Sequence, residues 1–398
     1  MRLHALPPVR RAVPVKTGGS ADGQAIGHFF GARQVTIYPS GTAALAHAIR
    51  QSAERSPTKA PEVILPAYGC PDLIAACVYA GVFPRLVDVS PGAWGYSHRD
   101  LERQVSENTV AIVAVNLLGV GDEAAALYSF CQSRGIALIQ DSAQYLPRAD
   151  TEWPGDYVVL SFGRGKPLNL LLGGALIART ADAEAPSAAI HRLPLKARFL
   201  ASRLAAVAFN TLTRPGLYGL LSALPGTGLG VVVYTPLECA SVLPDWVARR
   251  MNSAFDDYRR VPAYQRKIWE PVLSNWHRWG IEALRAVQHE PDAEPLRLAL
   301  LAPDRASRDT LVSEFTRAGL GASRFYGTEL TRISGIPAVA RSQGPFPNAA
   351  RLAARLLTLP THTLVSVDSV NEADRIVRTW HRKRTAVACP PPTSPSDV

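Results

Sequence analysis

Short runs of apolar, β-branched residues alternate with alanine-rich segments along the first half of the chain. Such runs are typical of buried strands, and the segments between them have helical character. Strand–helix alternation at this spacing indicates a parallel sheet covered on both faces, with ligands beyond the carboxyl ends of the strands. The pattern predicts helices such as 42–51 and 122–133, and strands at 35–38, 62–66, 85–89, 110–115, 136–140, 157–161 and 175–178.

The pattern changes after about residue 245. Long helices come first, then a strand-like run at 296–303, another helix, and a helix from residue 348 that ends before Pro360. This order predicts a small α/β domain behind a large one, as the chain length also suggests. We therefore divide the chain into an N-terminal arm (1–24), a large domain (25–243), a small C-terminal domain (244–385) and a disordered tail (386–398).

An apolar insertion at 196–237 interrupts the large domain. Residues 215–237 carry no charge and are numerous enough to span a bilayer, but three prolines and five glycines disfavour a continuous helix. Nearer its start, apolar residues recur at helical spacing with basic residues beside them. We favour packing of this face on a partner subunit or over the active site, and the alternative is peripheral contact with a membrane. The apolar residues are Phe199, Leu200, Leu204, Val207 and Ala208, and the basic ones are Lys196, Arg198 and Arg203.

Composition narrows the class of protein. Of 398 residues, 47% are hydrophobic and 19% are charged, which is typical of a globular chain with a sizeable core. The five cysteines are scattered without a CxxC pair, so we expect neither a zinc site nor a disulfide framework. The first residues lack the apolar run of a secretory signal, which favours a cytoplasmic protein. The net charge of +10 suggests an anionic substrate or an acidic surface as a partner, and no nucleic-acid-binding motif accompanies it.

Residues with candidate chemistry follow three of the predicted strands. Ser40, Gly41 and Thr42 open a helix whose free N–H groups would attract an anion, although an ordinary helix cap is the commoner role. Asp141 ends a buried strand, where a carboxylate needs a partner such as a pyridinium N–H; a helix cap is the alternative. Lys166 stands between glycine-bearing turns, where it would be either an amine nucleophile in a cleft or a solvent-facing loop residue.

The joint order of these motifs resembles the DegT/DnrJ/EryC1/StrS family of aminotransferases, which use pyridoxal 5′-phosphate (PLP). The resemblance runs from about residue 30 to 377. It is carried by SGTAAL at 40–45, EVILPAY at 62–68, YAGVFPRLVDV at 79–89, GIALIQDSAQ at 135–144 and SFGRGKPLNLLLGGALIA at 161–178. It implies the PLP fold type I, with a mostly parallel seven-stranded sheet in the large domain and a small C-terminal α/β domain.

The resemblance also implies roles for single residues. Lys166 would hold PLP as a Schiff base and later move a proton, and Asp141 would pair with the ring nitrogen. Gln144 would bind near the ring hydroxyl. The phosphate would be held by Gly41, Thr42 and Ser161. An aromatic residue stacks on the ring in the family; Cys70 stands at that position here, with Tyr68 two residues earlier.

Two departures from the family bear on the substrate. The family's HLYG-like motif is NLLG here, and no GxNxR-like segment, which reaches the neighbouring subunit's site in sugar aminotransferases, is found. The implied function is a homodimeric PLP-dependent aminotransferase, moving an amino group from glutamate or glutamine to a keto sugar or related carbonyl compound in polysaccharide or secondary-metabolite biosynthesis. The alternatives are another PLP reaction such as dehydration, and a catalytically idle homologue. Retention of Lys166 and Asp141 argues against both.

Overall fold

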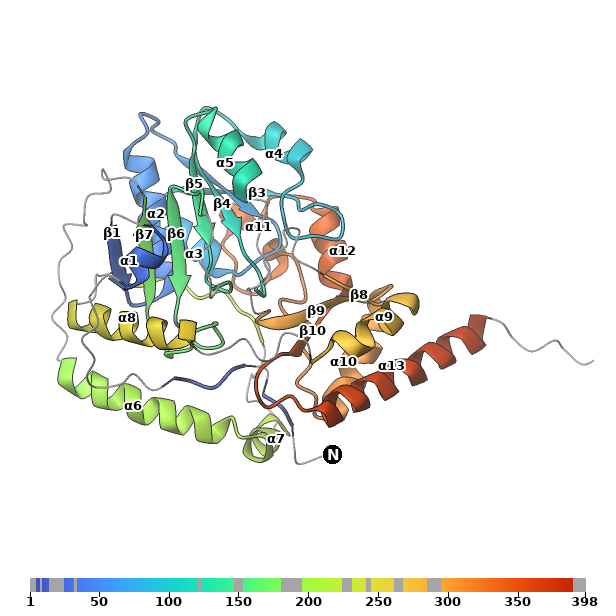
Figure 1. Ribbon diagram of the computed structural model, residues 1–398. Helices are drawn as coiled ribbons and strands as arrows, with labels where there is room; N and C mark the ends of the chain where they lie inside the picture. The colour runs from blue at the N-terminus through green and yellow to red at the C-terminus, as the bar shows by residue number, and fades with distance from the viewer. Residues whose placement is uncertain are drawn as a thin grey trace, which may run out of the picture.

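A seven-stranded sheet forms the centre of the large domain (Figure 1). The computed structural model describes residues 5–7, 9–13, 25–31, 34–119, 124–146, 153–179, 195–223, 231–240, 245–260, 268–284 and 295–388. Its strands are β1 (Gln34–Tyr38), β2 (Glu62–Pro66), β3 (Phe83–Val87), β4 (Thr109–Val115), β5 (Ala137–Asp141), β6 (Tyr157–Ser161) and β7 (Gly174–Ala178). All seven predicted strands are confirmed, with small shifts at their ends.

The strand order is β1-β7-β6-β5-β4-β2-β3. Strands β3, β2, β4, β5 and β6 pair in parallel, whereas β7 is antiparallel to both of its neighbours, β6 and β1. The sheet is therefore mostly parallel, as expected. Because only β7 is reversed, the carboxyl ends of the other six strands lie at one edge of the sheet, where a ligand site is expected.

Alternate residues of the strands face two different helix layers. Val63 and Leu65 pack towards one face, whereas Ile64 between them packs towards the other, as the period of two in a strand requires. The first face is covered by α2 (Gly41–Glu54) and α3 (Asp72–Ala80). The other is covered by α4 (His98–Gln104), α5 (Ala124–Gln132), α1 (Ala25–Phe29) and α8 (Asp245–Arg260). Helix α8, which we placed in the small domain, thus packs against the large sheet.

The small domain is built on a three-stranded antiparallel sheet in the order β10-β9-β8. Its strands are β8 (Glu282–Ala283), β9 (Arg297–Leu301) and β10 (Leu356–Pro360). Its helices are α9 (Glu270–Arg278), α10 (Arg305–Arg317), α11 (Ala338–Arg341), α12 (Pro347–Arg355) and α13 (Val367–Ala388), with a short 3₁₀ turn at Leu330–Arg332. The helix expected from residue 348 to just before Pro360 was wrong after Arg355, where β10 begins, because a leucine-rich run fits either a helix or a buried strand. Residues 386–388 are helical, and the rest of the expected tail lies outside the described residues.

The N-terminal arm crosses between the two domains. Leu6 is buried in the core of the small domain, and its N–H donates to the carbonyl of Gly319 at 2.8 Å. His362 Nε2 lies 2.8 Å from the carbonyl of Pro7. Further along, the N–H of Val13 donates to the carbonyl of Asn169, just after the Lys166 loop. These bonds hold the arm beside the edge of the large sheet that carries the predicted site.

Candidate active site

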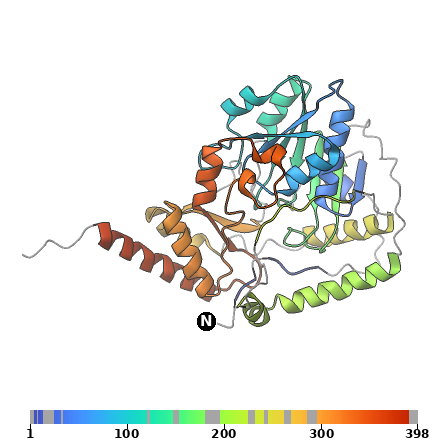
Figure 2. The ribbon, with the colours of Figure 1, turned by 180° about the vertical axis from the view of Figure 1, so that it is seen from behind.

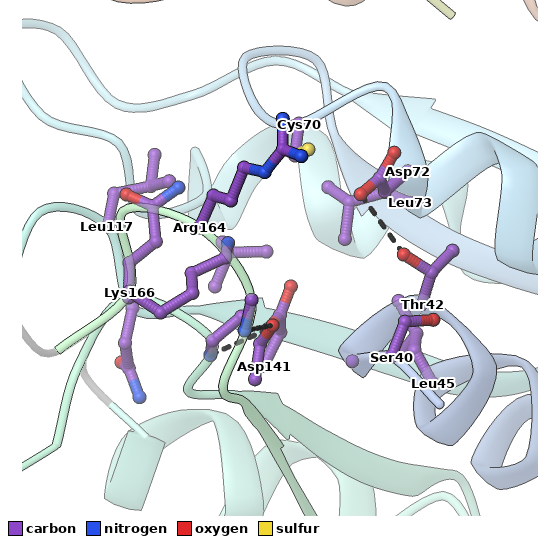
Figure 3. Close-up of a pocket in the computed structure, with 17 residues that line it drawn as sticks. Ser40, Thr42, Leu45, Cys70, Asp72, Leu73, Leu117, Asp141, Arg164 and Lys166 are labelled. Atoms are coloured by element: carbon purple, nitrogen blue, oxygen red, sulfur yellow. Dashed lines mark hydrogen bonds between the residues drawn. The ribbon is translucent and has the colours of Figure 1, made fainter. Parts of the chain in front are cut away.

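A cavity of about 260 Å³ lies at the carboxyl ends of the parallel strands (Figure 3). Its walls come from the segments that follow β1, β2, β4, β5 and β6, as expected for an open α/β sheet. Its lining includes Ser40, Gly41, Thr42, Cys70, Asp72, Leu73, Asn116, Leu117, Asp141, Gln144, Ser161, Gly163, Arg164 and Lys166. Of the predicted site residues, only Tyr68 is missing from this lining.

The amino-terminal end of α2 forms one wall. Ser40 caps the helix, because its hydroxyl accepts a hydrogen bond from the N–H of Ala43 at 3.1 Å. A side chain at Gly41 would meet Ser161 Cβ at 2.7 Å, and one at Gly174 would meet the backbone of Ser40 and Gly41 at 2.5 Å. Glycine at 41 and 174 therefore allows the start of α2 to pack directly on β6 and β7. The result is a helix terminus in the cavity, which favours an anion.

Asp141, the last residue of β5, supplies a buried carboxylate. Its side chain is 8% exposed, and its Oδ1 accepts a hydrogen bond from the N–H of Ala143 at 3.0 Å. Burial raises the pKa of Asp141, while the Ala143 hydrogen bond and the Lys166 charge act to lower it. Among the described residues, no hydrogen bond is made to its second oxygen, Oδ2. Such a carboxylate is suited to a cationic N–H partner.

Lys166 follows β6 on a turn in which its N–H donates to the carbonyl of Gly163 at 3.3 Å. Its side chain lies in the cavity near Asp141 (Figure 3). Gly165 has a φ of +72°, which favours glycine, and its missing side chain leaves space for Val9 of the arm, whose Cγ1 would stand 2.9 Å from a Cβ there. The arm thus fixes the back of the loop that presents the lysine.

Gln144 is held at both ends of its amide. Its Oε1 accepts from the N–H of Leu118 at 3.2 Å, and its Nε2 donates to the hydroxyl of Tyr326 at 2.9 Å. Tyr326 belongs to the small domain, so this bond ties the small domain to the cavity wall. The preceding residue, Phe325, has a φ of +58°, an unusual conformation for a bulky side chain. Tyr326 was absent from the sequence-based site, although it lies in GLGASRFYG at 319–327, which resembles a C-terminal motif of the family.

Cys70 and Tyr68 occupy different places. Cys70 lines the cavity, and burial raises the pKa of its thiol to about 12, which keeps it neutral at pH 7. Tyr68 is fully buried, and its ring packs edge-on against Tyr326 with centroids 5.6 Å apart. The side chain of Tyr68, which we included among the cofactor-binding residues, therefore lies outside the cavity lining.

Two charged side chains of the cavity were not anticipated from the sequence. Asp72 begins α3, and its Oδ2 accepts a hydrogen bond from the hydroxyl of Thr42 at 3.0 Å. The hydroxyl of Thr42 is thereby engaged, and its N–H remains as the group that would face an anion. Arg164 extends towards Cys70 across the mouth of the cavity (Figure 3). For Arg164, the only feature of the sequence that indicated a place in the cavity was its proximity to Lys166 in the GRGK motif. No feature of the sequence indicated such a place for Asp72.

Part of the chain is similar in sequence to proteins with assigned functions. The chain is 30% identical over 149 residues to UDP-N-acetyl-3-dehydro-alpha-D-glucosamine 3-aminotransferase of Acidithiobacillus ferrooxidans, covering 36% of this chain and 39% of that one. It is 24% identical over 156 residues to GDP-perosamine synthase of Vibrio cholerae, covering 38% and 42%. The matched part therefore spans less than half the length of these relatives.

Solved structures show the fold. The aminotransferase TlmJ from Streptoalloteichus hindustanus superposes with a TM-score of 0.65 at 20% identity, covering 95% of this chain and 93% of that one. Spr1654 from Streptococcus pneumoniae, solved in a PMP form, gives a TM-score of 0.68 at 17% identity, covering 97% and 100%. Residues 23–199, which hold the whole cavity lining, match the model of the DegT/DnrJ/EryC1/StrS aminotransferase family. Over these residues the chain is similar to the DegT/DnrJ/EryC1/StrS aminotransferase family.

Proposed function

We propose that the chain is a PLP-dependent aminotransferase. It moves an amino group from a small-molecule donor, glutamate or glutamine, to a keto sugar or related carbonyl acceptor in polysaccharide or secondary-metabolite biosynthesis. It acts as a homodimer in the cytoplasm. The single observation that carries the proposal is the meeting of Lys166, the buried Asp141 and the amino-terminal end of α2 in one cavity. The names of relatives that act on UDP-, GDP- and dTDP-linked sugars support the acceptor class.

The residues of the cavity fit PLP by their chemistry. The helix terminus at Gly41 and Thr42, with Ser161 beside it, suits a phosphate. The buried Asp141, with its pKa raised by burial, suits the protonated ring nitrogen of a pyridine. Lys166 supplies the amine that would attach the cofactor covalently. When bound, PLP supplies an electron sink that allows an amino group to be moved between two carbon skeletons.

The chain's own residues would divide the work as follows. The N–H groups of Gly41 and Thr42 and the hydroxyl of Ser161 bind the phosphate. The carboxylate of Asp141 would hold the proton on the ring nitrogen. Gln144, which is fixed by Leu118 and Tyr326, would bind near the ring hydroxyl. Lys166 Nζ accepts and returns a proton at the substrate carbon. Arg164 at the mouth provides a cation for an anionic substrate group.

Cys70 stands at the position where an aromatic residue would stack on the cofactor ring. Its side chain is much smaller than the aromatic residue expected at this position and is a neutral thiol at pH 7. One face of the ring would therefore be covered less completely, and the phosphate and Asp141 would contribute more to holding the cofactor.

The activity is tested in two half-reactions. Protein reconstituted with PLP is mixed with L-glutamate or L-glutamine, and the absorbance of lysine-bound PLP is followed. We expect one donor to remove this absorbance, and a nucleotide-linked keto sugar to restore it faster than a simple keto acid does. Bound PLP that responds to neither donor would instead favour another reaction of this fold, such as dehydration.

Tyr326 provides a prediction about positioning. Tyr326→Phe removes the hydroxyl that accepts from Gln144 Nε2 and leaves the ring packing in place. One such hydrogen bond contributes about 0.5–1.5 kcal/mol, so the Kd for PLP should rise by roughly two- to tenfold. Fluorescence titration with PLP measures this change. Tyr157→Phe, which alters a buried tyrosine outside the cavity lining, is the matched control and should bind PLP as the wild type does.

A further inference from the structure

Helix α6 (Leu195–Leu212) and helix α7 (Pro215–Ala223) lie along the lower side of the molecule in both ribbon views (Figures 1 and 2). They form most of the insertion that separates this chain from the expected pattern of its family. The N-terminal arm attaches them to the body. Asn210 of α6 accepts from the N–H of Ala12 and donates to its carbonyl, both at 2.8 Å, and the N–H of Ala5 donates to the carbonyl of Pro215 at 3.0 Å.

The outward side of these helices is apolar. Leu204 and Val207 are each 62% exposed, Leu212 is 46% exposed, and Leu220 of α7 is 51% exposed. Leu204 and Val207 are three residues apart and share one side of α6, and the inward side carries the buried Ala206 instead. Contiguous exposed apolar side chains of this kind mark an interaction surface. We call the side formed by Leu204, Val207, Leu212 and Leu220 the apolar stripe.

The surroundings of the apolar stripe are basic. No aspartate or glutamate occurs from residue 185 to 237, whereas Lys196, Arg198, Arg203 and Arg214 do. Arg214 is exposed. Arg214 stands two residues after Leu212, the last residue of α6, so its charge lies at the end of the apolar stripe. An apolar side with a basic edge matches the interfacial region of an anionic lipid bilayer, which offers acyl chains next to negative headgroups.

A second copy of the chain fits this surface less well. A two-fold contact made by the same patch on both subunits would bring the arginines of one stripe towards those of the other. The segment from 185 to 237 offers no carboxylate to pair with them. Within the described part of the chain, no helix is long and apolar enough to cross a membrane. Contact with one leaflet of a bilayer therefore agrees with the lack of carboxylates in this segment and with the lack of a spanning helix among the described residues.

We propose that the α6–α7 segment docks on the surface of an anionic lipid bilayer, with the apolar stripe at the level of the headgroups. The arm runs between α6 and the Lys166 loop, since Ala12 bonds to Asn210 and Val9 packs against Gly165. Docking would therefore hold the catalytic cavity close to the lipid surface. This inference is independent of the proposed amino transfer and can fail or succeed without it.

Co-sedimentation of the full chain with vesicles tests the proposal. We expect the wild type to pellet with phosphatidylcholine vesicles that contain phosphatidylglycerol, at least tenfold more strongly than with phosphatidylcholine alone, and less strongly in high salt. Leu204→Gln with Val207→Gln should reduce binding at least tenfold. Arg203→Glu with Arg214→Glu should abolish the preference for the anionic lipid.

The matched control changes the same charge elsewhere. Arg382→Glu with Lys383→Glu alters two exposed basic residues on α13, and binding should stay within about twofold of the wild type if α6 and α7 form the docking site. The substituted side chains of Leu204, Val207, Arg214, Arg382 and Lys383 are exposed. Circular dichroism checks that all of the variants fold. Failure of the folded wild type to bind anionic vesicles at low salt would overturn the proposal. So would a dimer in light scattering that dissociates on Leu204→Gln with Val207→Gln without any vesicle binding, because the stripe would then be a contact between copies.

Discussion

Lys166→Ala should remove both the absorbance of lysine-bound PLP and the amino-transfer activity. No other lysine lines the cavity among the described residues, so no second amine stands where the cofactor would be attached. Loss of covalent attachment and of the proton-transfer group together should lower kcat by about a thousandfold or more. Absorbance spectra of the reconstituted protein and single-turnover kinetics with the amino donor measure the two effects.

The attachment point is tested directly by reduction. Borohydride treatment of the wild type followed by peptide mass spectrometry should place the pyridoxyl group on Lys166. Lys59→Ala, which removes an exposed lysine distant from the cavity lining, should leave both absorbance and activity unchanged. Normal turnover by Lys166→Ala, or labelling of a different lysine, would show that the cofactor assignment of this loop is wrong.

Asp141→Asn should lower the rate and spare cofactor binding. The substitution keeps the shape of the side chain and removes the negative charge that would hold the proton on the ring nitrogen. Loss of one charge-assisted hydrogen bond in a site shielded from water costs about 2–4 kcal/mol, which corresponds to a rate reduction on the order of 30- to 1000-fold. The affinity for PLP should persist, because the phosphate would be held separately by Gly41, Thr42 and Ser161.

Asp156→Asn is the matched control for this charge. The carboxylate of Asp156 accepts from the N–H of Leu138 at 2.8 Å and lies away from the cavity lining. Its loss should affect stability more than turnover. Should Asp141→Asn turn over as fast as the wild type, the carboxylate would serve only to cap the turn through Ala143.

Most of the cavity was readable from the sequence because its residues follow strands. A buried parallel strand is a short apolar run, so its end is visible, and the topology of such sheets brings those ends together. Gly41, Asp141 and Lys166 were found in this way, whereas Ser161 came from the resemblance to the family. The prediction of site residues failed where the direction of a side chain decided whether it lines the cavity. Tyr68 follows β2 as Cys70 does, yet it turns into the core behind the cavity.

Local sequence patterns did not predict the contacts between segments that are far apart in the chain. Gln144 and Tyr326 are 182 residues apart, and nothing in either motif indicates that the small domain fixes a side chain of the large one. The carboxylate of Asp72 at the hydroxyl of Thr42 is a similar case, since its place depends on how α3 packs beside α2. Pairing of this kind is set by the packing of whole elements.

The sequence by itself determined the elements, the family motifs and the kind of chemistry at the end of each strand, because each depends on residues close together in the chain. Tertiary structure alone decided the reversed direction of β7, the position of α8 on the large sheet and the outward orientation of the apolar stripe. Helical periodicity shows that Leu204 and Val207 share a side. Whether that side meets the core or the solvent depends on where the N-terminal arm and the sheet leave room for it, and here the arm occupies the inner side.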